Sequence, residues 1–233
     1  MERYAVYYAP PAGHALAVFA VAWLGRCPEG GAVGARPAVP GLAPERLATI
    51  LAEPARYGFH GTLKPPFRLA AGRSAAELHA TLDDLARGLR PFDLPPLRLA
   101  AIGRFLALVP DGPSPALDAV TAACVLGLDP FRAPPGAAEL ARRRRAPLDA
   151  RHEALLQRWG YPYVLDRFRF HLTLTGSVAA DEQAALLAAL APLVAPFTAT
   201  PLAFADLALF VEPTAGAPFR LERRFPLGAT RAS

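Results

Sequence analysis

An internal repeat constrains the fold of this 233-residue chain more than any other feature. The segment His60-Gly61-Thr62-Leu63 precedes a helical pattern over residues 74–89, then a Pro-Phe pair and a Pro-Leu pair that opens an apolar strand. The segment His171-Leu172-Thr173-Leu174 precedes the same features in the same order, with the helical pattern over residues 180–194. Two copies are too few for a solenoid, which needs at least about three stacked units. They predict two lobes related by a pseudo-two-fold axis, which would bring the two His-x-Thr segments face to face.

The remaining patterns predict an α+β fold. Residues 3–8 look like a strand, and the apolar stretch from Ala15 to Leu24 predicts a buried helix that carries Trp23. We expect antiparallel sheets in both lobes to face a central cleft, with helices on the outside. The predicted organisation is one bilobal domain over residues 1–233: lobe one at roughly 45–112, lobe two at roughly 160–227 plus the N-terminal strand 2–8, and a helical insert at roughly 113–159.

Each His-x-Thr segment predicts a strand with one chemically active face. Side chains alternate along a strand, so over residues 56–64 and 166–175 a histidine, a threonine and basic side chains share one face, opposite aromatic and leucine side chains. One histidine can take a proton from an attacking oxygen and a second can protonate the leaving oxygen. Hydroxyls and cations can stabilise charge on the phosphate. The predicted acid-base pair is His60 and His171, and the predicted phosphate-binding residues are Thr62, Thr173, Lys64, Arg169 and Thr175.

The repeat decides how much weight these short motifs receive. One isolated His-x-Thr segment would favour an ordinary half-buried strand, because short motifs have a high false-positive rate. A second copy inside a matching repeat reverses that balance. Gly61 lies on the opposite face, where we expect it to allow close packing. The other histidines, which lack a repeated context, are interpreted as structural: His14, His79 and His152.

The charge of the chain favours anionic ligands. Its net charge is +5, and Lys64 is the single lysine among 25 basic residues. The run Arg142 to Arg145 is either a solvated helix face or a patch that contacts phosphate or RNA. Cys27 and Cys124 have neither a disulfide-scaffold nor a metal-ligand pattern, so a reducing cytoplasm is expected. The stretch from Ala15 to Leu24 is too short to cross a bilayer, and no membrane partner is predicted.

Paired His-x-Thr segments in two similar lobes resemble the two-histidine (2H) phosphoesterase superfamily over essentially the whole chain. Residues 3–11, 57–67 and 167–176 further resemble a poorly characterised branch whose members are often encoded beside phosphonate-degradation genes. The resemblance implies His60 and His171 as the acid-base pair and Thr62 and Thr173 as phosphate ligands, without a metal or cofactor. It also implies substrates such as cyclic phosphates or 2′-phosphate linkages of RNA ends.

The predicted function is a metal-independent phosphodiesterase that acts on a cyclic or linear phosphodiester, with a link to phosphonate metabolism. Its expected partner is a small phosphorylated or nucleotide substrate, and RNA ends stay among the candidates. The alternatives are an RNA-end 2′,3′-cyclic phosphodiesterase or ligase-like enzyme, and a non-catalytic phosphate- or nucleotide-binding module. A histidine-ligated metal hydrolase is disfavoured, because neither polar face carries Asp, Glu or a further His. The sequence does not assign the base, the acid or the oligomeric state.

Overall fold

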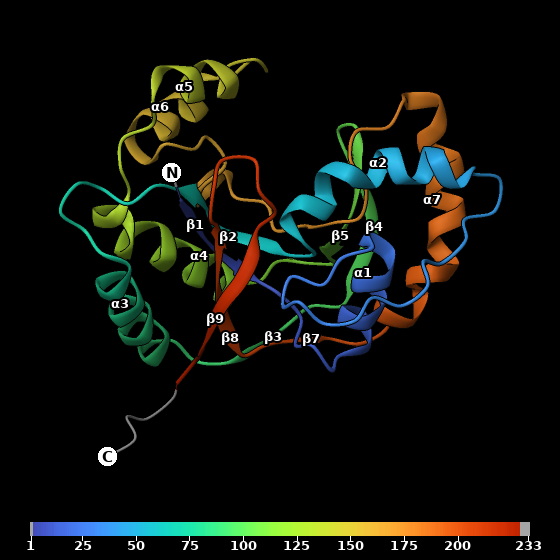
Figure 1. Cartoon of the computed structure of the whole chain (residues 1–233), viewed down its shortest axis with the longest axis horizontal. Coiled ribbons are helices and arrows are strands. Elements are labelled where there is room, and N and C mark those ends of the chain that lie inside the picture. Colours follow the sequence, from blue (N-terminus) through green and yellow to red (C-terminus); the bar gives the residue numbers. More distant parts are fainter. Residues whose placement is uncertain (1, 229–233) are drawn as a thin grey trace.

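Strand β1 (Arg3–Tyr8) lies inside the largest sheet of the computed structural model, which describes residues 2–228 (Figure 1). Its neighbours are antiparallel, and the order of the sheet is β2-β1-β8-β9. Alternation along β1 separates two faces, because Val6 and Tyr8 enter the main core whereas Ala5 and Tyr7 pack in a smaller aromatic cluster. The other strands of this sheet are β2 (Gly61–Phe67), β8 (Asp206–Glu212) and β9 (Arg220–Pro226).

The second half of the fold contains a three-stranded sheet of order β4-β5-β6 and a separate β3-β7 pair, all antiparallel. The apolar segment from Leu97 to Pro110 is a hairpin rather than the single strand suggested by its composition, because Gly103 and Arg104 form a two-residue turn. The strands are β3 (Phe92–Leu94), β4 (Leu97–Ile102), β5 (Phe105–Pro110), β6 (Leu172–Thr173) and β7 (Leu202–Phe204).

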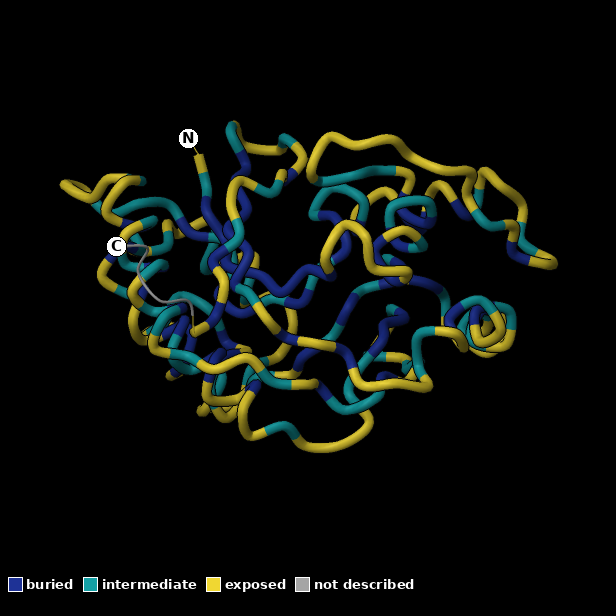
Figure 2. The backbone as a smooth tube through the Cα atoms, turned by 90° about the horizontal axis from the view of Figure 1, so that it is seen from below, coloured by how far each residue is buried: buried dark blue, intermediate teal, exposed yellow. Residues whose placement is uncertain are grey.

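Helices pack around both sheets. The helices α3 and α4 contact the four-stranded sheet, α7 contacts β4 and β5, and α1 contacts α2 (Figure 1). Figure 2 shows buried backbone in the interior and exposed backbone at the periphery. The segment 28–38 is largely exposed. The helices are α1 (Ala15–Leu24), α2 (Pro44–Tyr57), α3 (Ala75–Gly88), α4 (Pro115–Gly127), α5 (Ala137–Arg143), α6 (Ala150–Trp159) and α7 (Ala180–Val194), with short 3-10 turns at η1 (Asp129–Phe131), η2 (Leu165–Arg167) and η3 (Ala195–Phe197).

Most predicted elements and the α+β class are confirmed. Helix α1 buries Trp23, whose indole donates to the Leu174 carbonyl at 2.8 Å, and α3 and α7 coincide with the repeated helical patterns. The two strands predicted around the histidines are shorter in the structure than the sequence pattern indicated. Arg56 belongs to the last turn of α2, Arg167 lies in η2, and β6 has two residues.

The two repeats exchange strands between the sheets. The strand that follows the first histidine pairs with β1 and, through it, with β8 of the second repeat, whereas β5 of the first repeat pairs with β6 of the second. Each sheet therefore combines strands from both repeats, so segments 45–112 and 160–227 are intertwined. This exchange places the two His-x-Thr segments in different sheets on one connected core.

No helix within residues 2–228 is long and apolar enough to cross a membrane.

Candidate active site

A cleft of about 610 Å³ brings the two His-x-Thr segments together. Thr62 lines it from β2 of the four-stranded sheet and Thr173 from β6 of the three-stranded sheet, and His60 and His171 line it from the positions directly before these strands. All four side chains are partly buried, so they are held in place while remaining open to a ligand. The tertiary structure thus joins residues that are more than a hundred positions apart in the chain.

Both histidines are held by the same backbone contact. Nδ1 of His60 lies 2.8 Å from the Gly58 carbonyl, and Nδ1 of His171 lies 2.8 Å from the Arg169 carbonyl. A carbonyl only accepts hydrogen bonds, so each Nδ1 carries its proton and Nε2 is left to contact a bound molecule. The turn that permits this contact at His60 uses Gly58 at φ +77°, a conformation that favours glycine.

Burial lowers the pKa of both histidines. The pKa of His60 falls to about 4, chiefly because the charged imidazolium loses solvent; the Gly58 hydrogen bond opposes the shift and the proximity of His171 adds to it. The pKa of His171 is lowered by the same loss of solvent, opposed by its bond to Arg169. Both rings are therefore neutral at pH 7 in the free protein.

Aromatic rings support both imidazoles. The Tyr7 ring stacks on His60 with centroids 3.9 Å apart, and Phe105 tilts against His171 at 5.4 Å. Tyr57 lies 6.0 Å from His60 on the side of α2. Tyr7 was not assigned from the sequence, although alternation in β1 places it on the face opposite Val6 and could have indicated it.

Lys64 does not reach the cleft, which corrects the prediction that it binds phosphate. In the pairing of β1 with β2, Tyr7 faces Thr62 but Val6 faces Lys64, so Leu63 is an extra residue in a β-bulge. The bulge turns Lys64 toward the core, where it is 2% exposed and donates to the Val125 carbonyl at 3.0 Å. Val125 lies in the last turn of α4, so Lys64 caps that helix.

Two further predicted phosphate ligands do not offer a free donor to the cleft. Arg169 is exposed and lines a separate hollow beside β4, while its carbonyl holds His171. The Thr175 hydroxyl borders the cleft, but it accepts from the Leu106 amide and donates to the Gly176 carbonyl. The single O–H donor of this buried side chain is therefore already used, and Thr175 joins the segment after β6 to β5.

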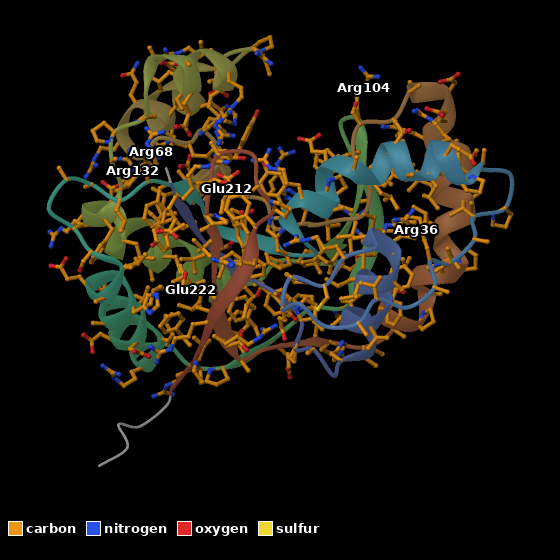
Figure 3. The ribbon with its side chains drawn as sticks, viewed as in Figure 1. Arg36, Arg68, Arg104, Arg132, Glu212 and Glu222 are labelled. Carbon is orange, nitrogen blue, oxygen red and sulfur yellow. The ribbon has the colours of Figure 1, made fainter. Side chains whose placement is uncertain are left out.

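Arginines that the sequence prediction left out make the cleft strongly basic. Arg3 and Arg56 both pair with the buried Glu212, which also accepts from the Gly216 amide. Figure 3 labels Glu212 in the half of the molecule with the four-stranded sheet and Arg104 at the end of the β4-β5 hairpin in the other half. Glu53 is the carboxylate among the lining residues. The guanidinium groups that line the cleft belong to Arg3, Arg56, Arg104, Arg142 and Arg143.

The arginines of the run from Arg142 to Arg145 fall into two groups. Arg142 and Arg143 face the cleft from α5, whereas Arg144 pairs with Glu153 of α6.

Among residues 2–228, no group of three or more His, Cys, Asp or Glu side chains is placed to share a metal ion. The histidines interpreted as structural are engaged elsewhere: His14 caps α1, His79 pairs with Glu222 and His152 pairs with Asp149.

Comparison with known families and structures gives matches over most of the chain. Residues 62–220 match a family described as "Protein of unknown function (DUF1045)". The chain is similar to the structure of Escherichia coli LigT complexed with 3′-AMP, at 15% identity and a TM-score of 0.42, covering 97% of this chain and 98% of that one. It is similar to a structure described as a phosphoesterase at 14% identity and a TM-score of 0.42, covering 97% and 99%.

Two curated relatives are more similar in sequence. Both are called ribose 1,5-bisphosphate phosphokinase PhnN. The protein from Janthinobacterium sp. (strain Marseille) is 37% identical, over 97% of this chain and 51% of the relative. The protein from Laribacter hongkongensis (strain HLHK9) is 43% identical, over 95% of this chain and 51% of the relative. The chain therefore spans about half the length of the curated relatives it matches.

Proposed function

The chain belongs to the DUF1045 family of proteins of unknown function, and from its cleft we propose that it is a metal-independent phosphodiesterase with His60 and His171 as its acid-base pair. The observation that carries this proposal is the matched placement of the two imidazoles. Each directs Nδ1 to a backbone carbonyl and keeps Nε2 for a ligand in one basic cleft. This arrangement suits an anionic substrate that needs one proton removed and one supplied.

The proposed reaction is hydrolysis of a phosphodiester to a phosphomonoester and a hydroxyl group. Nε2 of one histidine takes a proton from water as its oxygen attacks phosphorus. The bond from phosphorus to the leaving oxygen breaks, and the other histidine gives its proton to that oxygen. The hydroxyls of Thr62 and Thr173 donate to the non-bridging oxygens, where charge develops. Solvent then returns both histidines to their starting protonation states.

The difference between the two pKa values supports His60 as the base and His171 as the acid. His60 has the larger shift, so in the singly protonated pair the proton favours His171. Binding of the negatively charged phosphate raises the pKa of both rings, because an adjacent anion stabilises imidazolium. A substrate therefore promotes the protonation that the acid needs.

Two observations support a proposal for the substrate class: the charge of the cleft and the names of the relatives. Five guanidinium groups line the cleft, and they remain in excess when Glu53, Glu212 and Glu139 are counted against them, which favours a phosphate ester. The names of the relatives include ribose 1,5-bisphosphate, which suggests testing ribose phosphates, as does the sequence resemblance to proteins encoded beside phosphonate-degradation genes. We propose a cyclic phosphodiester of a ribose or a nucleoside, and RNA ends are tested beside it.

The test is ³¹P NMR of the purified protein in the presence of a chelator. The panel contains nucleoside 2′,3′-cyclic phosphates, ribose 1,2-cyclic phosphate 5-phosphate, a linear dinucleotide and an RNA with a 2′,3′-cyclic phosphate end. The wild type should convert at least one diester to a monoester, and His60→Ala and His171→Ala should each lose roughly 10²–10⁴-fold in rate. His152→Ala is the matched control, because His152 pairs with Asp149 outside the cleft.

Three outcomes would contradict the proposal. Turnover that requires added metal would replace it with a metal mechanism. Turnover that survives the double His60→Ala, His171→Ala substitution would remove the histidines from the chemistry. Binding of the diesters without any turnover would support a phosphate-binding module instead.

The assignment of acid and base has its own test. A p-nitrophenyl phosphodiester releases a weakly basic phenolate, which needs little protonation. His171→Ala should therefore retain far more activity on this ester than on an alkyl phosphodiester, whereas His60→Ala should lose activity on both. The opposite pattern would exchange the two roles.

A further inference from the structure

We propose that the same cleft contains a second anion site, formed by Arg3 and Arg56 with Arg142 and Arg143, which binds a phosphate monoester carried by the phosphodiester substrate. This inference rests on the proposed function and deepens it, because it restricts the substrate to phosphodiesters with a further phosphate group. The four arginines of this second anion site line the cleft together with the histidines.

One buried carboxylate positions two of these guanidinium groups. Glu212 is 0% exposed, lies directly across from Arg3 in the pairing of β1 with β8, and also pairs with Arg56 from the end of α2. The Arg3 and Arg56 side chains stay 18% and 33% exposed. One negative charge neutralises only one of two positive charges, so the trio has a net charge of +1. The trio is thus a fixed cation whose open side borders the cleft.

Helix α5 supplies the other two guanidinium groups. Arg142 and Arg143 share the carboxylate of Glu139, each at 3.9 Å, so this side also has a positive excess. Arg143 lies over the Tyr161 ring at 4.5 Å, which limits its orientation. Within residues 2–228, Nε of Arg143 and Nε of Arg56 are buried without a hydrogen-bond partner. Buried donors of this kind need an acceptor, and the oxygens of a bound phosphate would provide one.

Tyr57 contacts both His60 and the second anion site. The Tyr57 ring lies 6.0 Å from the His60 ring, and the Arg56 guanidinium carbon lies 5.2 Å from the centroid of the same Tyr57 ring. The histidines and the arginines therefore line neighbouring parts of one cleft. A substrate that carries two phosphate groups on one sugar is a small molecule that can bring one phosphate to each position.

The experiment compares substrates that differ only in one phosphate. Two pairs are used: a nucleoside 2′,3′-cyclic phosphate with and without a 5′-phosphate, and ribose 1,2-cyclic phosphate with and without a 5-phosphate. In at least one pair, kcat/KM for the phosphorylated member should be higher by roughly 10–100-fold, the effect of one or two charge-assisted hydrogen bonds. Arg143→Gln and Arg56→Gln should reduce that ratio toward one.

Arg145→Gln is the matched control for this test. Arg145 belongs to the same basic run, is exposed and is not among the lining residues, so its substitution should leave the ratio unchanged. Arg143→Gln keeps the test decisive if loss of Arg56 beside the buried Glu212 prevents folding. Inorganic phosphate should also inhibit competitively, and more weakly in Arg143→Gln.

The outcomes separate this inference from the proposed function. Turnover of neither member of either pair, and of no other diester in the ³¹P NMR panel, would overturn the proposed function. Equal turnover of both members, or a ratio that falls as much in Arg145→Gln as in Arg143→Gln, would overturn the second anion site and leave the phosphodiesterase in place.

Discussion

Gly61→Ala tests whether the packing between the two His-x-Thr segments sets the distance between the two histidines. Gly61 follows His60 directly, and its Cα faces the ring of Phe170, which directly precedes His171. A Cβ at this position would lie 2.5 Å from Cζ of Phe170, closer still to Cε2, and 3.1 Å from Cδ2. Close packing, the role expected for Gly61 from the sequence, is confirmed by this contact.

The size of the effect follows from the overlap. Carbon atoms in contact prefer separations of about 3.5–4.0 Å, so Phe170 or the backbone must move by about 1 Å. Phe170 is 6% exposed and has little room to move. Overpacking of this kind costs about 1–3 kcal/mol, and Tm should fall by roughly 2–4 °C for each kcal/mol. The same displacement moves His171 relative to His60 and should lower kcat by roughly 10²-fold.

Thermal unfolding and turnover of four proteins measure this coupling: wild type, Gly61→Ala, Phe170→Leu and the double variant. Leucine leaves room for the new methyl group, so the double variant should be more stable and more active than the sum of the single effects predicts. Gly88→Ala, whose Cβ would meet nothing within 4 Å, is the control. Additive effects, or an unchanged kcat in Gly61→Ala, would refute the reasoning.

Three further predictions concern individual side chains. Because kcat/KM reports the free enzyme, its pH profile should be bell-shaped, with an acid limb near pH 4 from His60 and an alkaline limb below pH 6.5 from His171; a single limb, or an optimum above pH 7, would contradict the proposed pair. The folded-state pKa of His60 is lowered from 6.5 to about 4, so its contribution to stability is present above pH 6.5 and is lost as the pH falls to about 4. That loss is at most about 3 kcal/mol, because partial solvent contact reduces it, and it should be absent in His60→Ala when urea unfolding is compared at pH 7 and pH 4.5. Lys64→Met should lower the free energy of unfolding by about 1–3 kcal/mol, since the Val125 carbonyl loses its donor, while kcat/KM stays near the wild-type value; a large loss of turnover without loss of stability would return Lys64 to the site.

Much of the site could be predicted from the sequence because its signal is local. The repeat identified His60, His171, Thr62 and Thr173, and all four line one cleft. The apolar stretch at α1, the repeated helical patterns at α3 and α7 and the strand pattern at β1 were also predicted from the sequence. These features depend on the spacing of side chains along the chain, which is a property of the segment itself.

Only the tertiary structure decided which cations accompany the histidines. A single extra residue at Leu63 reverses the alternation of β2 and sends Lys64 to the end of α4, and the register that creates this bulge depends on β1, more than fifty residues away. Glu212 pairs with Arg3 and Arg56 because strand β1 begins and helix α2 ends beside it. The histidines are determined by the sequence because a motif repeats, whereas the arginines are determined by the fold because strand pairing joins distant segments.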